Sequence, residues 1–262
     1  MTKDKPKKIN IVSNLSPWID GLALLTWGSL LLKYWSTGEI MLLIHPNYIW
    51  LVVWAGLTLT VMASLKLLPL VVAAIKGRWQ RSGEPEEAHI ALFPPGFGST
   101  LLVVVAIWGL LTTPKVLASD AALQRGVTET FSFTRAQPQS FRAAVKPEDR
   151  SIIDWVRTLN AYPEPDAYTG QKVNVTGFVV YSPELPKQYL LISRFILTCC
   201  AVDAYPVGIP VQIEGSTKDY PADDWLEIQG TMATEQLAGK RKLVIVPSDM
   251  TSIPTPKNPY DY

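Results

Sequence analysis

The sequence RFILTCCAVDA, residues Arg194–Ala204, is the stretch around which the chain is organised. It contains both cysteines of the protein, Cys199 and Cys200, side by side at the end of an apolar run. Arg194 precedes the pair and Asp203 follows it. An apolar run that is bounded by turn residues is typical of a buried strand. We therefore expect the cysteines at the end of a strand in a β domain.

Residues 146–262 carry the pattern of a small, mainly β domain with one leading helix. The helix is expected to begin at Lys146-Pro147-Glu148-Asp149, because proline and acidic residues suit a first helical turn. Alternating or apolar runs indicate five strands, at Lys172–Tyr181, Tyr189–Cys200, Ile209–Ile213, Trp225–Met232 and Leu243–Val246. This pattern favours an OB-like five-stranded barrel, with a five-stranded sandwich as the alternative. Ile253–Tyr262, which contains three prolines, is expected to form an extended tail.

Residues 1–118 form the predicted membrane domain. Three apolar runs, at about 17–35, 48–75 and 97–113, predict three transmembrane helices. A cleaved signal peptide is disfavoured, because no small-residue cleavage site follows the first run and a second apolar run comes soon after. Lys66 lies inside the second run. We interpret it as a lysine that extends to the membrane interface, with a contact to a partner helix or a transported ion as the alternative.

Basic residues predict the orientation of these helices. Four lysines precede the first apolar run, and the loop at 76–81 contains three basic residues, whereas the loop at 36–46 contains none. The positive-inside tendency then places the N-terminus in the cytoplasm. Three crossings would place residues 146–262 outside the membrane. Residues 119–145 are rich in polar side chains and are expected to be a linker, either a partly ordered stalk or an edge strand.

The charge of the chain argues against some classes of function. The formal net charge is +1, but residues 146–262 contain 11 Lys and Arg against 15 Asp and Glu. Nucleic-acid binding requires a basic surface, so no nucleic-acid partner is expected. Residues 146–262 also contain no histidine for a Ser/His/Asp triad, and no glycine-rich phosphate loop precedes a helix. We therefore expect a protein that is not an enzyme.

Cys199, Cys200 and Asp203 are the candidate ligands of a metal ion. Thiolates with a carboxylate suit a soft or borderline ion such as zinc. His45 is a weaker candidate, because it is the only histidine predicted on the same side of the membrane. Arg194 could pair with Asp203 or lower the pKa of a thiol.

Two other interpretations of the cysteines remain open. Buried cysteine behaves as a small hydrophobe, in which case Arg194 and Asp203 form a structural ion pair. Redox chemistry is the third interpretation. Neighbouring Cα atoms lie about 3.8 Å apart, below the range of roughly 4.4–6.8 Å for disulfides, so a bond between Cys199 and Cys200 would be strained and relatively reducible. On a strand, only one of the two side chains would face a pocket.

Several motifs spread over nearly the whole chain carry a family resemblance. They are Ser36-Thr37-Gly38-Glu39, His45-Pro46-Asn47-Tyr48, Gly170-Gln171-Lys172-Val173, Gly177-Phe178-Val179, Arg194-Phe195, Thr198-Cys199-Cys200-Ala201-Val202-Asp203-Ala204, Trp225-Leu226-Glu227-Ile228-Gln229-Gly230 and Pro256-Lys257-Asn258-Pro259-Tyr260. With these motifs the sequence resembles the YcgQ-like family of bacterial membrane proteins. Ala201-Val202 is a minor departure, since relatives often have serine or alanine after the cysteines.

The resemblance implies an accessory subunit that works with a separate multi-span permease. It implies an integral protein of the bacterial plasma membrane, or of an internal membrane. Metals, and zinc in particular, are the solutes that it suggests. It also makes a functional role for the Cys199, Cys200 and Asp203 stretch the favoured interpretation.

Overall fold

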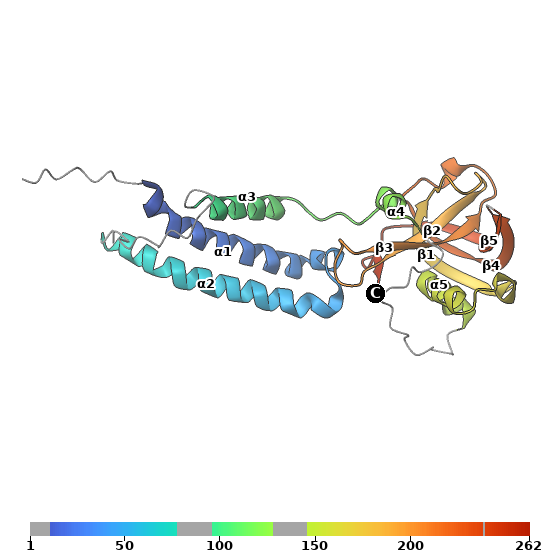
Figure 1. Ribbon diagram of the computed structural model, residues 1–262, viewed down its shortest axis with the longest axis horizontal. Helices are drawn as coiled ribbons and strands as arrows, with labels where there is room; N and C mark the ends of the chain where they lie inside the picture. Colours follow the sequence, from blue (N-terminus) through green and yellow to red (C-terminus); the bar gives the residue numbers. More distant parts are fainter. Residues whose placement is uncertain (1–10, 78–95, 128–145, 238) are drawn as a thin grey trace, which may run out of the picture. The chain divides into compact units, whose positions relative to one another are not determined.

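The computed structural model describes residues 11–77, 96–127, 146–237 and 239–262 (Figure 1). The chain divides into two compact units, Met1–Pro114 and Lys115–Tyr262, which we call the helical unit and the β unit. The β unit thus begins before residue 146, and it includes the first part of the segment predicted to be a linker. The rest of that segment, residues 128–145, lies outside the described residues.

The helical unit consists of α1 (Ile11–Thr37), α2 (Ile49–Ile75) and α3 (Phe97–Leu111), with the short 3-10 turns η1 (Glu39–Leu42) and η2 (Pro46–Tyr48). Two segments, Leu15–Thr37 and Pro46–Ile75, are long and apolar enough to cross a membrane. With 15 residues, α3 reaches about 23 Å, short of the roughly 30 Å of a hydrocarbon core. The predicted apolar spans are confirmed for two segments, which suggest membrane association, while the third crossing and the orientation stay predictions.

Small residues bring the helices of this unit together, as in membrane helix pairs. A Cβ atom on Gly28 of α1 would lie 2.6 Å from the hydroxyl oxygen of Thr60 on α2. Ala63 of α2 is fully buried. Large apolar side chains point outward instead, since Trp54 is 64% exposed and Trp108 is 71% exposed. This distribution of small residues inside and large apolar residues outside suits a lipid environment.

One polar cluster ties the three helices to one another. The Lys66 ammonium of α2 donates to Asp20 Oδ2 of α1 at 3.0 Å, and the Ser99 hydroxyl of α3 donates to Asp20 Oδ1 at 2.5 Å. Lys66 therefore contacts a helix of its own chain. The interpretation in which Lys66 also extends to the membrane interface stays a prediction.

The β unit contains α4 (Ser119–Arg125), α5 (Ile152–Ala161), the short 3-10 turns η3 (Pro147–Asp149), η4 (Pro165–Tyr168) and η5 (Thr217–Asp219), and the strands β1 (Lys172–Val180), β2 (Tyr189–Ile196), β3 (Tyr205–Gln212), β4 (Trp225–Leu237), β5 (Lys240–Ile253) and β6 (Tyr260–Asp261). The strands form one sheet in the order β1-β4-β5-β3-β2-β6, and β1 also pairs with β2. The predicted mainly β domain with a leading helix is confirmed, but the helix begins at Ile152 and not at Lys146, because Arg150 and Ser151 are extended between η3 and α5. The sheet has six strands instead of five, and a closed barrel is not assigned.

The core of the β unit lies between α5 and the sheet. Ser151 and Asp154 form a capping box that satisfies N–H groups at the start of α5, and Trp155 on this helix is completely buried. Gly177 of β1 allows a close approach of β2, because a Cβ atom there would lie 2.6 Å from the Ser193 carbonyl oxygen. The packing of the β unit thus depends on a large buried side chain at Trp155 and on the absence of one at Gly177.

The C-terminal segment packs against β2 through a buried tyrosine. Tyr260 is 1% exposed and packs edge-on against Phe195 of β2, with ring centroids 6.4 Å apart. Its hydroxyl oxygen accepts a hydrogen bond from the Leu117 N–H at 2.9 Å. The segment that was expected to be an extended tail therefore closes with β6, which pairs in parallel with β2.

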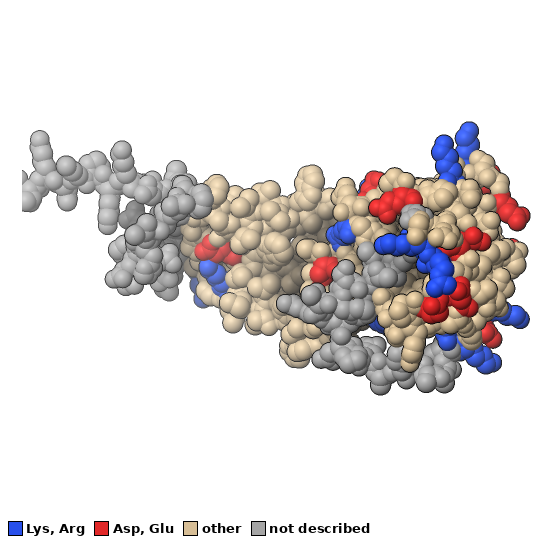
Figure 2. Space-filling view, turned by 45° about the vertical axis from the view of Figure 1, so that its right-hand side comes forward, with Lys and Arg blue, Asp and Glu red and all other residues tan. Residues whose placement is uncertain are grey.

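Charged side chains are unevenly distributed between the units. On the face shown in Figure 2, the described Lys, Arg, Asp and Glu residues gather on the β unit, whereas the helical unit is mainly uncharged. The exceptions in the helical unit include two ion pairs, Lys66–Asp20 and Lys33–Glu39. This difference suits a unit that meets lipid and a unit that meets water.

Candidate functional site

Both cysteines lie in the loop that joins β2 to β3. β2 ends at Ile196 and β3 begins at Tyr205, so the predicted strand through Cys200 is too long by four residues. The argument that alternate strand faces would separate the two cysteine side chains therefore does not apply. A loop allows both to point the same way.

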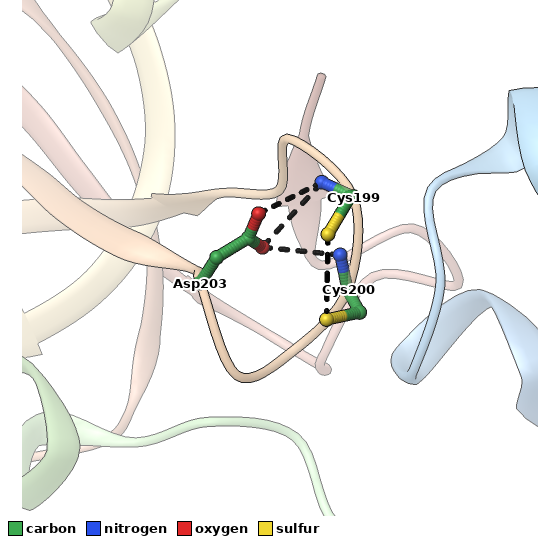
Figure 3. Close-up of side chains that lie close together, drawn as sticks. All are labelled: Cys199, Cys200 and Asp203. Atoms are coloured by element: carbon green, nitrogen blue, oxygen red, sulfur yellow. Dashed lines mark hydrogen bonds between the residues drawn. The ribbon is translucent and has the colours of Figure 1, made fainter. Parts of the chain in front are cut away.

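The Asp203 carboxylate holds this loop from the inside (Figure 3). Its Oδ2 accepts the Thr198 hydroxyl at 2.5 Å and the Cys199 N–H at 3.1 Å, and its Oδ1 accepts the Cys200 N–H at 3.0 Å. The loop closes with a hydrogen bond from the Asp203 N–H to the Cys200 carbonyl at 3.1 Å. Oδ1 also accepts the Cys199 N–H at 3.4 Å, so each carboxylate oxygen has two hydrogen-bond donors.

The two sulfur atoms lie within reach of one ion. Cys199 Sγ and Cys200 Sγ are 3.5 Å apart, both thiols are free, and Cys199 is exposed while Cys200 is partly exposed. One ligand atom from each of Cys199, Cys200 and Asp203 lies within 4.8 Å of the others. Tetrahedral zinc with Zn–S distances of about 2.3 Å requires two sulfurs about 3.8 Å apart. The sulfur separation therefore fits such an ion with a small adjustment.

The electrostatics of the loop favour a bound cation over a free thiolate. Hydrogen bonding with Asp203 is the largest cause that raises the pKa of Cys199 to about 12, and hydrogen bonding with Cys200 is the next. Burial would raise the pKa of Asp203, but the hydrogen bonds from Thr198, Cys199 and Cys200 outweigh it and lower that pKa. At neutral pH the loop thus presents an ionised carboxylate beside a neutral thiol. A dication would be attracted by the carboxylate and would displace the thiol proton.

Arg194 does not take part in this site. Its Nη1 lies 3.6 Å from Asp261 Oδ1, and its Nη2 donates to the Asn258 carbonyl oxygen at 2.7 Å. The guanidinium also lies over the Trp225 ring, 5.6 Å from the centroid. The expectation that Arg194 pairs with Asp203 or lowers a thiol pKa is wrong, because its two Nη atoms contact Asn258 and Asp261 of the C-terminal segment. Arg194 instead holds the end of the chain against β2.

His45 belongs to the helical unit and is not among the three grouped ligand residues. Its Nδ1 accepts a hydrogen bond from the Asn47 N–H at 3.1 Å, which caps the turn η2. Its assignment as a weak metal-ligand candidate stays a prediction.

Two residues of the site are missed by sequence reasoning. The Thr198 hydroxyl contacts Asp203, and Arg125 of α4 donates to two carbonyl oxygens of the same loop. Thr198 is adjacent to the cysteines, so the short spacing to Asp203 is a signal that could have suggested it. Arg125 carries no such signal, because it is distant in the sequence.

Comparison with known proteins shows the family to which the chain belongs. The family model described as the DUF1980 N-terminal domain matches residues 19–128, and the one described as the DUF1980 C-terminal domain matches residues 136–262. The UPF0703 protein YcgQ of Bacillus subtilis (strain 168) is 27% identical over 116 residues, which are 44% of this chain. The match spans 40% of the length of that protein. No solved structure matches the chain. The chain belongs to the YcgQ-like, uncharacterised family that carries the DUF1980 N- and C-terminal domains.

Proposed function

We propose that the chain is a membrane-bound accessory subunit whose β unit binds a thiophilic cation, such as zinc, through Cys199, Cys200 and Asp203. One observation carries the proposal: two free sulfurs lie 3.5 Å apart beside a carboxylate on an exposed loop. Neither sulfur is buried as a small hydrophobe would be, which argues against a purely structural role for the pair.

The three donors leave the coordination of such an ion incomplete. Structural zinc sites are usually closed by four protein ligands, whereas sites that exchange a ligand keep an open position. Among the described residues, the group contains two sulfurs and one carboxylate. The open position and the exposure of the loop favour capture and transfer of the ion over permanent storage.

The acceptor that we propose is a multi-span permease in the same membrane. The outward-facing apolar side chains of the helical unit, such as Trp54 and Trp108, suit lipid or the helices of another membrane protein. The N-terminus would lie in the cytoplasm and the β unit outside it. We also propose that the β unit is an OB-like barrel, because β1 pairs with β4 at one side and with β2 at the other.

Thiol redox chemistry is the second candidate function. The contact between the two sulfurs, 3.5 Å apart, favours it, and the strain of a bond between adjacent cysteines would make such a disulfide readily reducible. The high pKa of Cys199 argues against it, because the thiolate is the nucleophile in thiol exchange. The carboxylate beside the thiols therefore makes cation binding the stronger proposal.

Metal titration of the full chain in detergent tests the proposal. Zinc is titrated by calorimetry and cadmium by its thiolate absorbance, with the protein reduced. The Cys199→Ser, Cys200→Ser double variant is expected to bind at least 100-fold more weakly, because it removes both soft ligands. The matched control is Ser248→Ala, an exposed site on β5. Absence of binding by the natural sequence, or equal binding by the double variant, would reject the metal site.

The redox and permease parts have their own measurements. If the redox function holds, intact mass after alkylation in buffers of graded potential would show two added alkyl groups at low potential and none at high potential, reversibly. Crosslinking in membranes, followed by identification of the product, would show whether a multi-span permease lies beside the chain. A chain that crosslinks to no permease would reject the subunit proposal and leave the metal site to be judged by titration.

A further inference from the structure

Arg125 donates hydrogen bonds to the loop at residues 197–204, which joins β2 to β3 and which we call the dithiol loop. Nη1 of Arg125 donates to the Ala201 carbonyl oxygen at 3.1 Å and to the Ala204 carbonyl oxygen at 2.5 Å. These two carbonyls lie on either side of Asp203 in the sequence. One nitrogen with two N–H donors can satisfy both, so the contact fixes the distance between the two ends of the segment that carries the carboxylate.

The arginine is itself held in place. Its guanidinium lies over the ring of Phe195, 5.9 Å from the centroid, and Phe195 is completely buried. α4 is anchored at its start by a hydrogen bond from the Ser119 N–H to Asp223 Oδ1 at 2.6 Å. The helix ends immediately after Arg125 at Gly126, which has a φ of 76°. The guanidinium is thus preorganised against the loop and does not reach it from a free side chain.

Asp203 accepts hydrogen bonds from N–H groups of the dithiol loop, and Arg125 donates hydrogen bonds to its carbonyl groups. Asp203 accepts the N–H groups of Cys199 and Cys200, while Arg125 donates to carbonyls farther along the loop. A free loop would have to lose conformational entropy when its two thiols close on one ion, and a preorganised loop avoids that cost. The two contacts thus restrain different parts of the loop that carries the sulfurs.

We infer that Arg125 is a positioning residue that sets the affinity of the Cys199–Cys200 loop for a thiophilic divalent cation. The inference rests on the proposed metal-binding function. It adds that α4, which begins shortly after the helical unit ends at Pro114, is part of the site. A binding unit that began at residue 146 would lack this arginine.

Two substitutions test the inference in the full chain in detergent. Arg125→Met keeps an apolar stem over Phe195 but removes both donors, and Arg125→Lys keeps the charge without the planar group. Arg241→Met is the matched control, since Arg241 pairs with Glu164 and Asp166 away from the loop. Cadmium affinity is measured by thiolate absorbance, the alkylation rate of Cys199 is measured without metal, and thermal unfolding reports folding.

The inference expects cadmium affinity to fall at least tenfold in Arg125→Met, less in Arg125→Lys, and less than twofold in Arg241→Met. It also expects faster alkylation of Cys199 in Arg125→Met, because a loosened loop weakens the contact with Asp203. Unchanged affinity and alkylation in a folded Arg125→Met variant would overturn it. Should Arg125→Met not fold, Arg125→Lys decides by the same two measurements. If the natural sequence binds no cadmium, the proposed function fails, and the alkylation rates alone decide whether Arg125 positions the loop.

Discussion

Replacing Asp203 with asparagine is expected to make Cys199 react between about 10 and 1000 times faster with alkylating agents. Hydrogen bonding with Asp203 is the largest cause of the rise in the pKa of Cys199 from 9.0 to about 12. Only the thiolate reacts, and its fraction at pH 8 falls tenfold for each unit of pKa, or about 1000-fold for the full rise. Tenfold is the lower bound, because the thiol is exposed to screening water and Cys200 contributes part of the effect.

The assay uses the full chain in detergent, reduced and free of metal. Iodoacetamide is added at pH 8, samples are quenched over time, and peptide mass spectrometry follows the modification of Cys199. Asp249→Asn is the matched control, because Asp249 is an aspartate of β5 that hydrogen-bonds to Thr251. Equal rates in Asp203→Asn and the natural sequence, with unchanged thermal unfolding, would refute the electrostatic account of the loop.

Three further predictions concern the β unit. Because folding lowers the pKa of Asp203, the stability that this carboxylate provides is present above its unfolded value of 3.8 and is lost as the pH falls through the lower folded value. Hydrogen exchange should detect this loss as smaller protection factors of residues 198–204 in acid, after correction for the intrinsic exchange rate at each pH. Arg194→Met is expected to destabilise the β unit by about 2 kcal/mol, because it leaves the largely buried Asp261 carboxylate unpaired. Asp261→Asn should cost less, because burial already raises the pKa of Asp261. Thermal unfolding distinguishes the two variants. Gly177→Ala should destabilise by about 2 kcal/mol, because its methyl group would meet the Ser193 carbonyl of β2, and an unchanged melting temperature would contradict that packing.

Only part of the candidate site can be predicted from the local sequence pattern. The adjacency of Cys199 and Cys200 and the short spacing to Asp203 are visible in the sequence, and they suffice to nominate the loop. The partner of Arg194 is not visible, because the choice between Asp203 and Asp261 depends on where the C-terminal strand docks. Sequence proximity favours Asp203 as the partner of Arg194, whereas in the fold Arg194 pairs with Asp261 near the C-terminus.

The sequence by itself determined two apolar spans and the presence of a mainly β domain with a leading helix, because these depend on periodicity among near neighbours. Only the tertiary structure decided that Tyr260 enters the core and that Arg125 reaches the dithiol loop. Those contacts join residues that are far apart along the chain, and their partners are chosen by packing of the whole unit. A local sequence pattern does not predict these partners, because the entropy cost of closing long loops is offset only by the packing of the complete fold.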